Sequence, residues 1–283
     1  MSALLVYKQL DFKNQFLHKV KKIEAILIKY RINFQTCFVN ELVNQKFGNN
    51  LIITIGGDGT LLGACHFVSN NIVLGLNLDP DNSVGSLCVA NVENFEQILK
   101  NYLNKIIFPQ SVIRLEIKHN SVILPILALN DILFTNNNPA AMTCYEILIG
   151  ETQVFHRNSG LWICTPCGST GATRSAGGQI LNITDKIVQW ICREPYYVAL
   201  PIPKLLHGFL KTKDKILIKC KTNDSQLYID GPHCSIFLER NDTLEIFLSD
   251  KHLNLLFTKE SEARRKEIGF LRKIAFQKRK KNS

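Results

Sequence analysis

A long apolar run is missing from this sequence, and with it any candidate membrane span. No stretch approaches the roughly 18 uninterrupted apolar residues that a bilayer requires, and the first residues, MSALLVYKQLDF, lack the basic start and apolar core of a secretory signal. The nine cysteines are odd in number and widely spread over 283 residues, unlike a small disulfide framework. We therefore expect free thiols in a cytoplasmic protein with no membrane partner.

Excess charge is also scarce outside one segment. Residues 264–281, RRKEIGFLRKIAFQKRKK, hold nine Lys or Arg and one Glu, which is +8 of the total net charge of +10. The high isoelectric point therefore belongs mainly to this segment and does not indicate that the folded body binds nucleic acid. Because its aromatic residues are limited to Phe270 and Phe276, we do not expect a nucleic-acid partner.

The first 108 residues alternate between strand and helix patterns. We predict strands at 3–7, 34–39, 51–55 and 72–77. We predict helices at 15–30, 60–68 and 92–103. The run LIITI is typical of a central parallel strand covered on both faces. This alternation predicts an α/β domain over 1–108 with a doubly wound parallel sheet.

A different pattern begins at Pro109. Short apolar runs separated by Asn, Gly, Asp and Pro predict a mainly antiparallel β domain over 109–260. The predicted strands are 112–118, 122–133, 144–149, 160–165, 187–192, 215–220, 226–230, 234–239 and 243–248. A small-residue segment, 168–178, interrupts them and favours a short helix. Residues 261–283 are predicted to form a basic C-terminal helix, either solvated or docked on the first domain or a partner subunit.

A glycine-rich turn, Gly56-Gly57-Asp58-Gly59, follows the strand LIITI directly. Glycines let a ligand approach the backbone, and free amides at a helix start favour phosphate, so Gly57, Gly59 and Thr60 are candidate phosphate-binding residues. The turn matches neither GxxxxGK[ST] nor GxGxxG. A carboxylate here is useful if Asp58 accepts a proton from an attacking hydroxyl or holds a metal ion. The alternative is a structural turn in which Asp58 caps the helix.

Several motifs resemble known kinases. GGDGT after a strand is similar to the turn of NAD kinases, diacylglycerol and sphingosine kinases and, in a close form, 6-phosphofructokinases. Residues 164–178, CTPCGSTGATRSAGG, resemble the TPTGSTAYSLSAGG-like segment in the second domain of NAD kinases. ALND at 128–131, Arg157, REP at 193–195 and IDG at 229–231 resemble further landmarks in family order. The chain thus resembles the NAD(H) kinases, and its plant-type NADH kinase branch in particular.

The resemblance implies transfer of the ATP γ-phosphoryl group to the 2′-hydroxyl of the adenosine ribose of NAD⁺ or NADH. It implies Asp58 as the catalytic base, Asn130 and Asp131 as ribose ligands, and Arg157 as a source of positive charge. The implied substrate-binding set is completed by Thr165, Thr170, Gly171, Ala172, Thr173, Arg174 and Ser175. Mg²⁺ is expected to arrive with ATP rather than in a protein metal site. A homodimer or homotetramer is also implied.

Three positions depart from the family pattern. Asp131 stands where the family has Glu, Ala172 where it has Tyr, and Ser159 where it has the Asp of an Arg-x-Asp-Gly turn. These changes alter the groups at the ends of the ligand. Loss of an acid near the nicotinamide removes an attraction for its positive charge and favours tolerance of neutral NADH.

Two other functions remain open from the residues. A lipid or sugar kinase would use the same GGDGT turn but leaves 164–178 unexplained, and a non-enzymatic nucleotide sensor would bind without turnover. Cys164-x-x-Cys167 has zinc or redox spacing, but no second CxxC or Cys/His pair stands at a suitable distance. His156 beside Arg157 is interpreted as a structural histidine.

Overall fold

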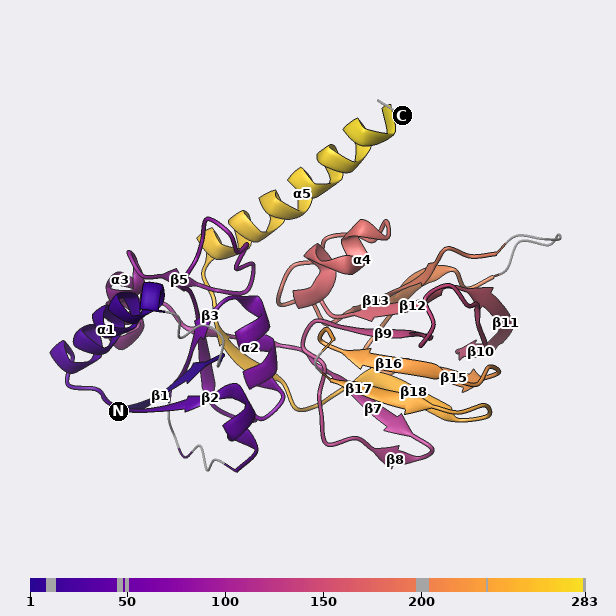
Figure 1. Cartoon of the computed structure of the whole chain (residues 1–283), viewed down its shortest axis with the longest axis horizontal. Coiled ribbons are helices and arrows are strands. Elements are labelled where there is room, and N and C mark those ends of the chain that lie inside the picture. Colours follow the sequence, from indigo (N-terminus) through magenta and orange to yellow (C-terminus); the bar gives the residue numbers. More distant parts are fainter. Residues whose placement is uncertain (9–13, 45–47, 49–50, 197–203, 233, 282–283) are drawn as a thin grey trace. The chain divides into compact units, whose positions relative to one another are not determined.

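The computed structural model describes residues 1–8, 14–44, 48, 51–196, 204–232 and 234–281 and divides into two compact units (Figure 1). The first unit comprises Met1–Val112 and His252–Ile268; the second comprises Ile113–Lys251 and the chain from Gly269. The boundaries expected at 108/109 and 260/261 divide the chain into continuous segments. The compact units are not continuous, because residues 252–268 belong to the first unit.

The first unit is built on a seven-stranded sheet in the order β2-β1-β3-β4-β19-β6, with β5 beside β4. Its neighbours are parallel except for the antiparallel pair of β19 and β6. The central strand β3 is buried along its whole length, as the run LIITI predicts. The strands are β1 (Ser2–Tyr7), β2 (Asn33–Phe38), β3 (Leu51–Gly56), β4 (Ile72–Asn77), β5 (Ala90–Asn91), β6 (Pro109–Val112) and β19 (Leu253–Leu256).

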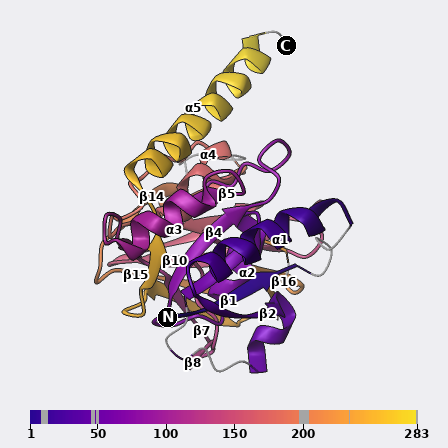
Figure 2. The same ribbon diagram turned by 90° about the vertical axis from the view of Figure 1, so that its left-hand side faces the viewer.

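Helices cover both faces of this sheet. The apolar face of α1 (Asn14–Lys29) and the residues Phe95 and Leu99 of α3 (Phe95–Leu103) share one core with alternate residues of β1, β3 and β4. Figure 1 shows α1 and α3 on one side of the sheet and α2 (Asp58–Cys65) on the other, and Figure 2 looks onto α1 and α3. A short 3-10 helix, η2, spans Val39–Asn44. The doubly wound sheet predicted from the sequence is therefore confirmed.

The second unit contains two six-stranded antiparallel sheets, in the orders β11-β10-β15-β18-β7-β8 and β14-β13-β12-β9-β16-β17. Inward residues of both sheets, such as Phe134, Tyr145 and Ile246, form one core. The strands are β7 (Leu115–His119), β8 (Val122–Ile123), β9 (Asp131–Asn136), β10 (Thr143–Ile149), β11 (Thr152–Asn158), β12 (Gly160–Cys164), β13 (Val188–Arg193), β14 (His207–Leu210), β15 (Lys215–Cys220), β16 (Ser225–Ile229), β17 (Ser235–Leu238) and β18 (Thr243–Leu248).

Some predicted elements differ in detail. The single strand expected over 122–133 is two strands, β8 and β9, in different sheets, because Pro125 cannot donate to a ladder and the chain changes sheet after it. The strands β5, β6, β11, β14 and β19 are not among those predicted from the sequence. The helix expected at 60–68 begins earlier, at Asp58, and ends at Cys65.

The remaining helices are short, apart from the last. Residues 167–170 form the 3-10 helix η3 (Cys167–Thr170), followed by α4 (Ala172–Ser175). The basic tail is helical, as predicted, and belongs to α5 (Lys259–Lys281). Among the described residues, no helix combines the length and the apolar character needed to cross a membrane.

Candidate active site

The carboxyl ends of β1, β3 and β4 meet at one edge of the parallel sheet. The strand order reverses beside β1, whose neighbours are β2 and β3, and such a switch point is where open α/β sheets bind ligands. A cavity of about 380 Å³ opens there. It is lined by Lys8, Phe16, Gly56, Gly57, Asp58, Gly59, Thr60, Asn77, Leu78, Asp79, Asn82 and Ser83.

The glycine turn lines this cavity with backbone. A Cβ on Gly57 would lie 2.6 Å from Ser83 Oγ, and one on Gly59 would lie 2.9 Å from Lys8 Nζ, so the backbone of the turn lies close against both side chains. The amides of Gly57, Asp58 and Gly59 have no hydrogen-bond partner within the described chain. They are donors at the start of α2, where an anion is favoured.

The amide of Thr60, expected to contact phosphate, instead forms a hydrogen bond at the start of α2. This amide donates to the carbonyl oxygen of Gly57 at 3.0 Å, and the Thr60 side chain is buried. Thr60 therefore closes the first turn of α2.

Asp58 does not cap the helix that it begins. Gly57 occupies the N-cap position, and no side chain caps α2. The Asp58 carboxylate instead accepts hydrogen bonds from the amides of Ser86 and Leu87, each at 2.8 Å. Burial raises the pKa of Asp58, while these two hydrogen bonds and the nearby Arg264 oppose the shift. The alternative reading of Asp58 as a capping residue is therefore wrong.

A second group of predicted residues meets in the second unit. Asn130 and Asp131 lie at the start of β9, and Asp230 follows the end of β16. The Asp230 carboxylate accepts the amides of Leu129 at 2.8 Å, Asn130 at 2.6 Å and Asp131 at 3.1 Å. This carboxylate therefore fixes the backbone that presents Asn130 and Asp131.

The side chains of that pair are poorly supplied with protein partners. Asn130 Oδ1 is buried and has no hydrogen-bond partner in the described structure. Burial, and then the like charge of Asp230, raise the pKa of Asp131 to about 7. An orphaned acceptor beside an acid that is hard to ionise suits a ligand that brings hydroxyl donors.

The segment 165–178 packs against the same strand end. Thr165 Oγ1 donates to the carbonyl of Leu129 at 2.5 Å, and a Cβ on Gly168 would lie 2.3 Å from the carbonyl oxygen of Asn130. A Cβ on Gly171 would lie 4.0 Å from Asp131 Oδ2. The structure thus brings the predicted small-residue segment beside Asn130 and Asp131.

Other predicted members of this segment have mixed surroundings. Thr170 and Thr173 are buried, whereas Ala172 is half-buried and Ser175 is exposed. Arg174 Nη1 donates to the carbonyl of Gly178 at 2.6 Å. Arg174 therefore holds the turn after α4 together.

Arg157 lies apart from this group. Its side chain is exposed on β11, with the guanidinium carbon 5.6 Å from the ring centre of Tyr196. Asp131 pairs with Cys164 at one end of the β9–β12 ladder, while the turn after Arg157 lies near the other end, where Thr135 Oγ1 donates to Ser159. Within this chain, Arg157 therefore lies away from Asp131.

The cysteine and histidine motifs are structural in this arrangement. Cys164 and Cys167 are buried free thiols, and burial raises the pKa of Cys164 to about 12. His156 is buried, with its ring nitrogens 3.2 Å from Tyr145 Oη and 2.8 Å from the carbonyl of Lys204. Within the described ranges, no three or more His, Cys, Asp or Glu side chains are placed to hold a metal ion.

Sequence reasoning missed several residues of both groups. Asn77 ends a predicted strand and Asp79 lies just beyond it, at the same sheet edge as the glycine turn, so the convergence of parallel strand ends was a usable signal. Lys8 follows β1 in the same way. The role of Asp230 as a backbone clamp had no local signal, because its partners lie about a hundred positions earlier.

Open amides, an ammonium and a buried carboxylate at the switch point of a parallel sheet are groups that a nucleotide-dependent phosphotransferase uses. No family model matches the chain. It is 35% identical over 245 residues to a probable NADH kinase of Oryza sativa subsp. japonica, covering 79% of this chain and 75% of the relative. It is 33% identical over 262 residues to an NADH kinase of Arabidopsis thaliana, covering 84% and 82%.

Solved structures show the same fold. An NAD kinase from Archaeoglobus fulgidus in complex with ATP superposes with a TM-score of 0.77 at 23% identity, covering 95% of this chain and 98% of that chain. Yeast NADH kinase complexed with NADH gives a TM-score of 0.75 at 18% identity, covering 94% and 86%. The chain belongs to the NAD(H) kinase family, and it is a kinase, as the motifs predicted.

Proposed function

We propose that this protein transfers the γ-phosphoryl group of ATP to the 2′-hydroxyl of the adenosine ribose of NAD⁺ or NADH, giving NADP⁺ or NADPH. The observation that carries this proposal is the cavity at the glycine turn, where free amides, Lys8 and Asp58 lie together. The plant relatives are named for NADH kinase activity. The structural neighbours were solved with ATP in one case and NADH in the other.

The donor phosphates are held by backbone and one cation. The amides of Gly57 and Gly59 donate to phosphate oxygens, and Lys8 neutralises part of their charge. Among the described residues, the Lys8 ammonium has no ion-pair or hydrogen-bond partner, although it lies against the turn. A half-buried ammonium facing open amides is a site arranged for an anion.

Mg²⁺ fits this site as an ion carried by the nucleotide. The carboxylates of Asp58 and Asp79 supply hard oxygen atoms to the cavity, but both already accept hydrogen bonds from the protein. When bound, the ion would offset charge on the donor phosphates. Asp79 is the residue whose carboxylate would contribute to holding it.

Asp58 receives the proton of the attacking hydroxyl. The ribose O2′ forms a bond to the γ-phosphorus, the bond from that phosphorus to the β,γ-bridging oxygen breaks, and ADP leaves with the electron pair. The two amide hydrogen bonds favour the ionised form of the Asp58 carboxylate and orient it before transfer. After transfer the carboxyl returns its proton to water.

The dinucleotide is held by the second unit. Asn130 Oδ1 and the Asp131 carboxylate accept hydroxyl donors of a ribose, which gives the buried Asn130 oxygen the partner it lacks. The small residues at 170–173 let the adenine lie close to the backbone, with Thr165 and Arg174 shaping the segment from behind. Ser175 at its exposed end completes the proposed set. Arg157, which lies apart on β11, stays a prediction from the family resemblance.

The test is product formation with several acceptors. Purified protein with ATP and Mg²⁺ is offered NAD⁺, NADH, diacylglycerol or fructose 6-phosphate, and products are identified by mass and by phosphorus NMR. We expect a phosphomonoester on the adenosine ribose of the dinucleotide alone. A product from the lipid or sugar, or ATP binding without turnover, would overturn the proposal.

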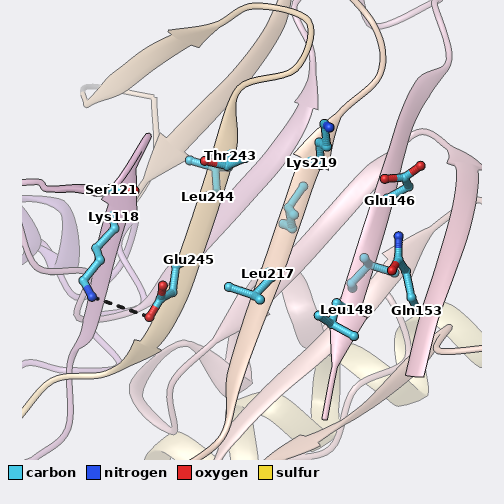
Figure 3. Close-up of a pocket in the computed structure, with 12 residues that line it drawn as sticks. Lys118, Ser121, Glu146, Leu148, Gln153, Leu217, Lys219, Thr243, Leu244 and Glu245 are labelled. Carbon is cyan, nitrogen blue, oxygen red and sulfur yellow. Dashed lines mark ion pairs between the residues drawn. The ribbon is translucent and has the colours of Figure 1, made fainter. Parts of the chain in front are cut away.

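We also propose a cytoplasmic homodimer or homotetramer. On the outer face of the sheet that contains β10 and β15, Leu217 and Leu148 lie beside the Lys118–Glu245 ion pair and line, with these residues, a hollow of about 240 Å³ (Figure 3). Apolar residues flanked by both charge signs suit a self-complementary contact between two copies. All nine cysteines are free thiols, as in a reducing compartment. Light scattering after gel filtration measures the assembly.

A further inference from the structure

The turn that holds Asp58 is itself held by a residue from the far end of the chain. Ser86 and Leu87 donate their amides to the Asp58 carboxylate. The carbonyls flanking those amides, of Gly85 and Cys88, accept hydrogen bonds from the Arg264 guanidinium, the first at 3.1 Å. Arg264 lies in the part of α5 that belongs to the first unit.

A single peptide group links the two charges. The carbonyl of Gly85 and the amide of Ser86 are the two ends of one peptide bond, so Arg264 lies at its oxygen and Asp58 at its N–H. Both hydrogen bonds are charge-assisted, and each polarises the peptide group in the direction that strengthens the other. The arrangement connects the C-terminal helix to the candidate base without direct contact between the two side chains.

The other end of the turn is fixed by Asn77. Gly85 has φ +57, and a Cβ there would lie 2.4 Å from Asn77 Nδ2, so the turn requires glycine at this position. Asn77 Nδ2 also donates to the carbonyl of Ser83 at 2.9 Å. Asn77 therefore fixes the entry to the turn. The carbonyl of Gly85 accepts both the amide of Cys88, at 3.1 Å, and the Arg264 guanidinium, which also donates to the carbonyl of Cys88.

We propose that Arg264 is a positioning residue for phosphoryl transfer: its guanidinium holds the 85–88 turn so that two amides keep the Asp58 carboxylate in place. This inference rests on the proposed function of Asp58. The positive charge of Arg264 also opposes the upward shift that burial imposes on the pKa of Asp58. Removing it therefore makes the carboxylate harder to ionise and less firmly oriented.

The experiment compares Arg264→Met with Arg264→Lys and Lys266→Met. Lys266 lies on the same helix and pairs with Glu262, so its substitution removes one positive charge without touching the turn. We expect Arg264→Met to lower kcat by about ten-fold or more, with little change in KM for ATP. The acid limb of its pH–kcat profile should move to higher pH, since a raised pKa keeps Asp58 protonated further up the scale. Arg264→Lys should restore part of kcat and move the acid limb part of the way back, and Lys266→Met should resemble wild type.

Two results would overturn the inference. One is a raised KM for ATP with unchanged kcat and pH profile in Arg264→Met, which would make Arg264 a ligand contact. The other comes from thermal unfolding in the Asp58→Asn background. We expect the stability cost of Arg264→Met to be smaller there than in wild type, because the carboxylate that the turn serves is gone. Equal costs in both backgrounds contradict the linkage, and this readout does not depend on kinase activity.

Discussion

Asp58 and Asp131 are acids placed beside buried strands in the two units, yet their surroundings are opposite. Asp58 accepts two backbone amides and lies within the field of Arg264. The carboxylate of Asp131 has no hydrogen-bond donor among the described residues and faces the like charge of Asp230. Burial raises the pKa of both acids. Hydrogen-bond donors from the protein favour the ionised form of Asp58 but not that of Asp131. Asp58 is therefore suited to accept a proton, whereas Asp131 is suited to accept hydrogen bonds from a ligand.

The largest expected effect is on catalysis through Asp58. Asp58→Asn should lower kcat by about 10²–10⁴-fold, because the amide is not basic enough to take the hydroxyl proton. Steady-state kinetics measure the loss, and circular dichroism checks folding. Asp81→Asn, at an exposed position of the loop after β4, is the matched control and should keep wild-type kcat. Full activity in Asp58→Asn would contradict the proposed base.

The next effect is on stability through Asp131. Its pKa of about 7 in the folded protein exceeds the ordinary 3.8, so the folded state binds the proton more tightly than the unfolded state. The free energy of unfolding should therefore fall as pH rises from about 4 to about 7, by roughly 2–4 kcal/mol. Asp131→Asn should remove most of this dependence and stabilise the free protein at alkaline pH.

Denaturant unfolding at several pH values measures that dependence. Asp250→Asn, at an exposed position of the same unit, is the control and should leave the slope unchanged. A pH profile of Asp131→Asn that superposes on wild type would show that Asp131 ionises without a penalty. The same variant should raise KM for the dinucleotide, because the Asn side chain accepts hydroxyl donors less strongly than a carboxylate.

The smallest effect concerns the donor phosphates. Lys8→Met should raise KM for ATP by about ten-fold and leave KM for the dinucleotide nearly unchanged, because the lost ammonium lies against the glycine turn, where the donor phosphates are proposed to bind. The raised KM should be less evident at high salt, where the wild-type contact is screened. Lys21→Met, on the exposed side of α1, is the matched control. Equal effects of the two substitutions would remove Lys8 from the site.

Most residues of the two site groups could be predicted from the sequence, because the patterns that mark them lie within short segments. The run LIITI, the glycines and the apolar spacing after them place a buried strand, a turn and a helix within fifteen residues, and the structure forms them. The segment 164–178 was found by its resemblance to one family, and packing places it against Asn130 and Asp131 as that resemblance implies. The expected amide contact of Thr60 failed because helix formation uses that amide internally.

The sequence by itself determined the alternation of strands and helices, the exposure of backbone amides at a glycine turn and the kinase family, since each depends on neighbouring residues or on an ordered set of motifs. Only the tertiary structure decided that β19 joins the first sheet, that Asp230 clamps the start of β9, and that Arg264 supports Asp58. These contacts join residues about one hundred to two hundred positions apart. Their partners are selected by packing and by the hydrogen bonds that buried peptide groups must make, which no local pattern records.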